Sequence, residues 1–103
     1  MASISVRPIG NTAKFTTSGD TLDDGVPRRI EQLFWAGFTL ATHTLVLSWK
    51  PVGAAEEFLS IVAGASSGAI RIPYKKTIPM KSPTQACDLV CTTIDSGKLT
   101  VQF

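Results

Sequence analysis

The sequence has few of the residues that build helical surfaces and catalytic sites. Its 103 residues include one His, two Cys and three Glu, and only 17% of them are charged. Sparse Glu and Lys disfavour solvated helix faces, and a formal net charge of +2 is far from the strongly basic balance of a nucleic-acid-binding protein. We therefore expect neither a helical protein nor one that binds nucleic acid.

Long hydrophobic runs are also missing. The longest apolar stretch, residues 33–38, is much shorter than the roughly 20 residues that cross a bilayer. Residues 1–15 contain no apolar segment of the kind found in signal peptides. The sequence thus predicts a soluble protein without membrane segments that is made in the cytosol. Its length predicts one domain over residues 1–103, which buries about two thirds of its unfolded surface on folding.

The two cysteines, Cys87 and Cys91, lie in a β-branched segment that reads as one strand. Four residues along a strand separate the Cα atoms by about 13 Å, whereas a disulfide needs about 4.4–6.8 Å. A zinc site would need further ligands, and His43 is the only histidine. We therefore expect two reduced thiols that pack as small apolar groups, and no metal or cofactor.

Residues that favour strands are abundant. Val, Ile, Thr, Phe, Trp and Tyr make up about a third of the chain, in short runs separated by turn residues at intervals of about ten. The predicted strands are 2–7, 12–17, 28–35, 43–49, 54–63, 70–73, 87–94 and 98–103. This pattern predicts an all-β fold, an antiparallel β-sandwich (jelly-roll or Ig-like) of seven to eight short strands. Gly97, within 95–97, predicts that the last two strands form a C-terminal β-hairpin.

Two segments leave their structure open. In 28–35 the run Leu33-Phe34-Trp35 is apolar on both faces, so either register can face the core. In 54–63 the spacing of Phe58, Ile61 and Val62 also fits a helix, although the β character of the rest favours a strand. Pro73 predicts an edge position for the strand at 70–73.

Chemical motifs are weak. The loop 18–27 contains Asp23-Asp24-Gly25, but it lacks the ligand spacing of a calcium loop, and an Asx turn is the simpler interpretation. His43 has no motif around it that would supply a nucleophile, and no phosphate-binding glycine loop is present. We therefore expect a binding protein rather than an enzyme.

Apolar residues near turns and on the edge strand are the candidate protein interface. Some must be partly exposed in so small a domain, and the alternative is that they close the ends of the sandwich. These candidates are Phe38, Leu40, Trp49, Val52, Ile70, Ile72 and Tyr74. The segment 74–86, with Lys75, Lys76 and Lys81, is expected to be a solvated loop or a contact surface for an acidic partner.

Segments near both ends of the sequence show a family resemblance. They are SVRPIGNT at 5–12, FTTSGD at 15–20, VPRRI at 26–30, Trp35, Gly37, HTL at 43–45 and TTIDSGKLTV at 92–101. Together these segments resemble a group of small proteins encoded in tailed-bacteriophage genomes. The resemblance implies a virion structural protein that is assembled in the host cytoplasm.

The leading interpretation of this resemblance is a head-decoration (cement) protein. Such a protein would bind the major capsid protein or other virion proteins, as a homo-oligomer for which a trimer is favoured. A tail, neck or fibre component is the alternative. A second alternative is a receptor- or glycan-binding module, in which Trp35 or Trp49 acts with the loop 20–24.

Overall fold

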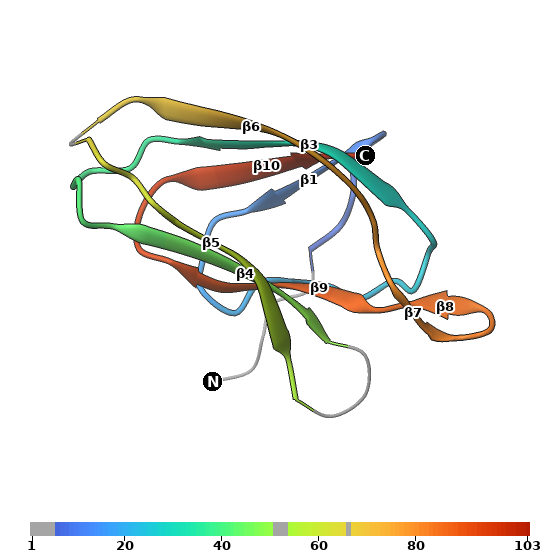
Figure 1. The fold of residues 1–103 in the computed structure, drawn as a ribbon. Coiled ribbons are helices and arrows are strands. Elements are labelled where there is room, and N and C mark those ends of the chain that lie inside the picture. Colours follow the sequence, from blue (N-terminus) through green and yellow to red (C-terminus); the bar gives the residue numbers. More distant parts are fainter. Residues whose placement is uncertain (1–5, 51–53, 66) are drawn as a thin grey trace.

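The computed structural model describes residues 6–50, 54–65 and 67–103, and within these ranges the regular structure is entirely β-strand (Figure 1). One antiparallel sheet contains, in spatial order, β1 (Thr12–Phe15), β10 (Lys98–Gln102), β3 (Arg29–Ala36) and β6 (Ala69–Thr77). The other contains β2 (Thr21–Leu22), β9 (Asp88–Ile94), β4 (Thr44–Lys50) and β5 (Glu56–Val62). A small hairpin of β7 (Met80–Ser82) and β8 (Gln85–Ala86) projects beside them.

The two four-stranded sheets confirm the predicted all-β sandwich, although their strand orders give no jelly-roll or Ig-like assignment. Large apolar side chains from both sheets are fully buried between them, including Phe15, Trp35, Leu45, Leu89 and Leu99. The accessible surface is 5679 Å², close to the roughly 5,600 Å² expected for a folded chain of this mass.

Most predicted strands are present. The segment 54–63 forms strand β5 rather than a helix, and Pro73 lies in an edge strand, as predicted. The expected strand at 2–7 lies mostly outside the described residues, although the Val6 N–H donates to the Thr21 carbonyl at 2.6 Å. The expected loop at 74–86 is wrong in part, because β6 continues to Thr77 and the β7–β8 hairpin follows.

A bulge settles the ambiguous register of β3. Its pairing with β6 shifts between Ile30 and Gln32. The extra residue reverses which side chains face inward. Before the shift the even-numbered Ile30 is buried, and after it the odd-numbered Leu33 and Trp35 are buried. Phe34 faces outward, with the Arg71 guanidinium 5.2 Å from its ring centroid. Neither uninterrupted register was therefore correct.

The predicted C-terminal hairpin is wrong, although both of its strands exist. β9 pairs with β2 and β4, whereas β10 pairs with β1 and β3 in the opposite sheet. Residues 95–97 thus form a corner by which the chain crosses from one sheet to the other (Figure 1). A short turn with glycine can join two paired strands of a hairpin or two strands of different sheets. Here the second connection forms, because β9 and β10 each bury their apolar side chains from a different sheet.

Side chains and backbone groups from 35–44 hold this corner in place. Trp35 Nε1 donates to the Ser96 carbonyl at 2.9 Å, and the Thr44 N–H donates to the Asp95 carboxylate at 2.8 Å. Ser96 Oγ accepts the Thr39 N–H at 3.0 Å and lies 2.6 Å from His43 Nδ1. The crossing is therefore fixed by hydrogen bonds to both sheets.

Gly97 is required at the corner. Its φ is 81°, and a Cβ there would lie 2.8 Å from the Phe38 nitrogen and closer still to the Ala36 carbonyl oxygen. We expect Gly97→Ala to lower the free energy of unfolding by about 3 kcal/mol, measured by urea denaturation. The control is Gly64→Ala, which also has a positive φ but open space around the new methyl group, and should cost about 1 kcal/mol. Equal losses in the two variants would contradict a packed corner.

Candidate functional site

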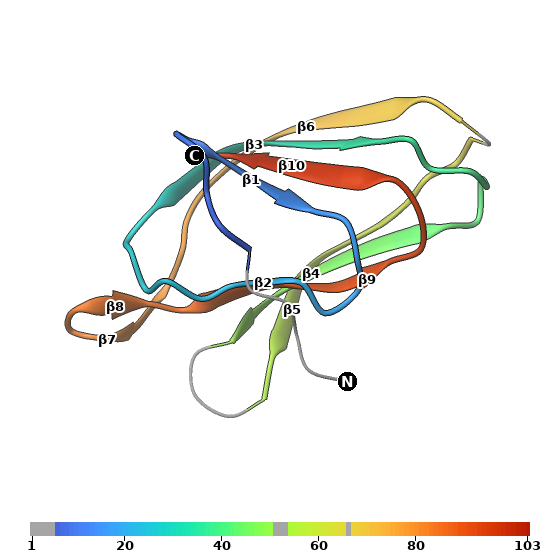
Figure 2. The same cartoon turned by 180° about the vertical axis from the view of Figure 1, so that it is seen from behind.

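The two lateral edges of the sandwich differ in how well they cover the core. β1 and β2 end the two sheets on one side (Figure 2), and their inward residues Ala13, Phe15 and Leu22 are all at most 3% exposed. β5 and β6 end the sheets on the other side. Here the inward residues are only partly buried, and we call this side the open edge.

Six apolar side chains line the open edge. They are Phe58, Leu59 and Ile61 of β5 and Ile70, Ile72 and Tyr74 of β6. The register places several of them on the core face: Leu59 and Ile61 pair with buried residues of β4, and Ile70 and Ile72 pair with buried residues of β3. Directly paired residues share a face of the sheet, so these side chains face inward and are left half-exposed because no further strand covers them.

Aromatic rings join the two sheets at this edge. Trp49 stacks on Phe58 with ring centroids 3.8 Å apart and planes 10° apart. Phe58 in turn lies 5.9 Å from Tyr74 of the opposite sheet, at an interplanar angle of 34°. This contact fixes Phe58 and Tyr74 at the same height along the edge.

Opposite charges lie at one end of the open edge. β5 begins with the exposed Glu56 and Glu57, and the exposed Lys75 and Lys76 follow Tyr74 near the end of β6. β6 begins at the end of the sandwich where β5 ends (Figure 1), so the two strands run in opposite directions. The acidic pair and the basic pair therefore lie beyond Phe58 and Tyr74 in the same direction.

The predicted interface residues separate into two groups. Ile70, Ile72 and Tyr74 lie together on the open edge, and Leu40 is 54% exposed elsewhere. Phe38 and Trp49 are only 3% and 6% exposed, which removes them from the predicted surface and places them in the core. Val52 lies outside the described residues.

The sequence reasoning missed three members of the open edge. Phe58, Leu59 and Ile61 lie in a segment that is apolar on both faces, so nothing in the local sequence marks them as exposed. Their exposure depends on β5 being the last strand of its sheet, which local sequence does not specify. Glu56 and Glu57 at the start of the strand were the available signal, because charged residues are common on edge strands.

The residues named for the glycan-binding alternative are largely buried. Trp35 and Trp49 are 1% and 6% exposed, so neither ring offers a face on which a sugar can stack. Asp20 is also buried, and its Oδ2 accepts the N–H groups of Thr16 and Thr17 at 2.9 and 3.0 Å. These three residues act inside the fold rather than at its surface.

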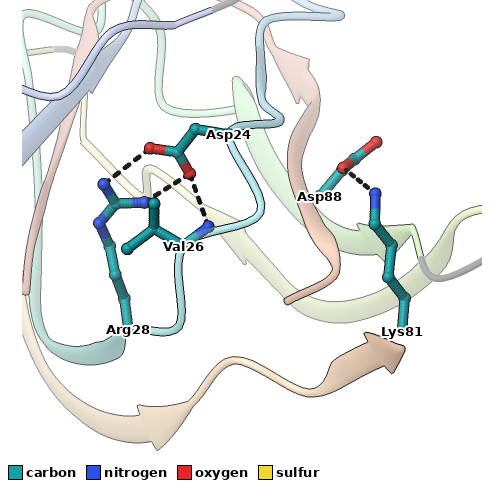
Figure 3. Close-up of polar contacts among 5 residues, drawn as sticks. All are labelled: Asp24, Val26, Arg28, Lys81 and Asp88. Atoms are coloured by element: carbon teal, nitrogen blue, oxygen red, sulfur yellow. Dashed lines mark hydrogen bonds and ion pairs between the residues drawn. The ribbon is translucent and has the colours of Figure 1, made fainter. Parts of the chain in front are cut away.

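The loop 20–24 ends in the predicted Asx turn, in which Asp24 Oδ1 accepts the Val26 N–H at 3.2 Å. Both carboxylate oxygens also accept from the Arg28 guanidinium at 2.7 Å (Figure 3). This hydrogen-bonded ion pair is the main reason why the pKa of Asp24 lies below its usual value. Within the described ranges, no group of three or more His, Cys, Asp and Glu side chains is arranged to hold a metal ion.

The Asp24–Arg28 ion pair should make the stability of the fold depend on pH. Because the pKa of Asp24 is lowered in the folded state, its stabilising effect is present at neutral pH and is lost as the pH falls below about 4. We expect Asp24→Asn to cost about 1 kcal/mol at pH 7, and the difference from wild type to shrink as the pH falls to 2. Urea denaturation at both pH values tests this expectation, with Arg28→Gln and the double variant completing a mutant cycle. A difference that persists unchanged at pH 2 would contradict it.

One lysine of the expected basic surface is paired within the chain. Lys81 Nζ lies 3.1 Å from Asp88 Oδ1 and ties the β7–β8 hairpin to β9 (Figure 3). Lys75 and Lys76 make no ion pair with any other residue that the structure describes. The basic segment therefore contributes two available cations, and both lie at the open edge.

Both thiols are buried, as expected from the sequence. Cys87 and Cys91 are unpaired, and burial raises the pKa of Cys91 to about 12 and that of Cys87 above its usual value. A thiol that stays protonated is a poor nucleophile. Their position inside the fold gives them a packing role.

The thiols provide a test of this burial. We expect the native protein at pH 8 to react with Ellman's reagent far more slowly than free cysteine, and both thiols to react after unfolding in urea. Reaction of one thiol in the native protein at the rate of an exposed cysteine would contradict the placement of that residue.

Comparisons with known proteins add no relative. No protein family, curated protein or solved structure matches this chain. Within residues 6–50, 54–65 and 67–103, no helix is long and apolar enough to cross a membrane.

Proposed function

We propose that this chain is a structural protein of a tailed-phage virion that binds other protein chains through its open edge. The observation that supports binding is the difference between the two edges of one sandwich. The β1–β2 edge covers its core residues, whereas six inward apolar side chains at the β5–β6 edge remain half-exposed. Contiguous apolar surface with charged residues beside it is typical of protein interfaces.

The estimated binding free energy favours attachment through several contacts rather than through a single open edge. Burying a further 30 Å² on a side chain contributes about 0.8 kcal/mol, so six such side chains contribute roughly 5 kcal/mol. Forming a complex costs about 4–15 kcal/mol in lost freedom of motion. One open edge against a flat partner would thus bind weakly, and stable attachment needs repeated or paired contacts, as a lattice provides.

The virion assignment rests on the resemblance of the terminal segments to small tailed-phage proteins. Within that class, a head-decoration protein is the function we favour, with the major capsid protein as its partner. A small domain with one exposed binding edge suits the repeated sites of a capsid surface. A tail, neck or fibre component would use the same edge at fewer sites.

Mass spectrometry of purified virions tests this proposal. We expect the chain in every particle preparation, in a copy number that matches the symmetry sites of the head, and density for it on the capsid in an image of the particle. A copy number that matches a tail or neck ring would contradict decoration and leave virion association standing. Absence from purified virions would contradict the proposal as a whole.

A further inference from the structure

We propose that the open edge is covered by a second copy of this chain, in a two-fold dimer in which β5 of each copy packs against β6 of the other. This inference builds on the proposed function, since it names a partner for the same binding edge.

The placement of the strands allows both contacts to form at once. β5 and β6 end the two layers of the sandwich on the same side, and they run in opposite directions. A two-fold axis parallel to the strands exchanges the two layers and keeps the strand directions. It therefore sets β5 of each copy beside β6 of the other, antiparallel, in both layers. Such an interface is isologous and closes at two copies.

The charges select this axis. The Phe58–Tyr74 contact fixes the height of the two strands, and rotation about an axis parallel to them preserves height. Glu56 and Glu57 of one copy then face Lys75 and Lys76 of the other, twice in the dimer. A two-fold axis perpendicular to the sheets would instead place β5 beside β5 and β6 beside β6 and reverse the position along the strands. The charged ends of the two copies would then lie at opposite ends of the contact, and the acidic pairs would not meet the basic pairs.

The four charged side chains are available for this role. All four are exposed, and none forms an ion pair with another residue in the described part of the chain. Across the interface they would lie beside half-buried apolar residues, where the exclusion of water strengthens their attraction. Each copy would contribute six apolar side chains to the same contact.

Pro73 determines how the two edges meet. It lies in β6 and has no N–H, so β6 cannot donate a complete ladder of hydrogen bonds to an added strand. Proline and lysine on an edge discourage indiscriminate strand pairing. The contact we propose is therefore made mainly by side chains, and its specificity comes from the matched charges.

The arrangement differs from the trimer expected from the family resemblance. A three-fold ring needs complementary surfaces on two different sides of each copy. Here the acidic and the basic groups lie on one side and complement each other only when two copies face each other. The lattice would then receive pairs of copies.

The experiment measures molar mass by light scattering over a concentration series of the full chain. We expect a dimer whose dissociation constant rises at least about tenfold between 50 mM and 500 mM salt. Glu56→Lys with Glu57→Lys, and separately Lys75→Glu with Lys76→Glu, should each weaken the dimer at least about tenfold. Lys14→Glu with Lys98→Glu is the matched control, since both lysines are exposed and lie on β1 and β10, and it should leave the dimer unchanged.

Mixing the two reversed variants gives the decisive result. One variant has basic residues on both strands and the other has acidic residues on both. Each alone should dimerise at least about tenfold more weakly than wild type, and an equimolar mixture should form a heterodimer at least as tight as the wild-type dimer. Unchanged circular dichroism and thermal unfolding of each variant show that loss of the dimer is not loss of the fold.

Three outcomes would overturn the inference: a wild-type monomer throughout the series, a stable trimer, or reversed variants that dimerise as well as wild type. These outcomes are separable from failure of the proposed function. A monomeric chain that is still found in virions would contradict the dimer alone. A charge-dependent dimer that is absent from virions would contradict the virion role alone.

Discussion

The corner at residues 95–97 is the constraint on which the sandwich depends. It sends β10 to the sheet opposite β9, so each of these strands becomes an interior strand of its own sheet. The corner holds because Gly97 adopts a positive φ where no side chain fits, and because Ser96 receives hydrogen bonds from Trp35 and Thr39. With this crossing made, Leu99 and Val101 of one sheet and Leu89 and Cys91 of the other are all fully buried in the core.

The order of strands in the two sheets also creates the open edge. The β1–β2 side is covered, whereas β5 and β6 end the sheets with core-facing residues half-exposed. The aromatic series Trp49, Phe58 and Tyr74 joins the layers there and fixes their relative height. Stability and binding are thus linked, because the residues that finish the core are also those that a partner would cover.

Much of the local structure could be predicted from the sequence. The alternation of Leu99 and Val101 with polar residues, and the β-branched segment at 87–94, gave the correct strands. The β3 bulge could not be predicted, because a single extra residue reverses which face is buried without changing the composition of the strand. Ser48 is a similar case, because it is polar but buried. Its hydroxyl lies 2.6 Å from Oγ1 of Thr92, which is 44 residues away in sequence and belongs to another strand.

The sequence by itself determined that the chain is β, that its thiols do not pair within one strand, and where most strands begin and end, because these properties depend on neighbours a few residues apart. Tertiary structure alone decided which strands pair, which of them lie at edges, and hence that Phe58 and Ile72 are half-exposed while Phe38 and Trp49 are buried. The physical reason is that burial and pairing depend on contacts between residues distant in sequence. The same turn residues and alternating patterns are compatible with several arrangements of those contacts.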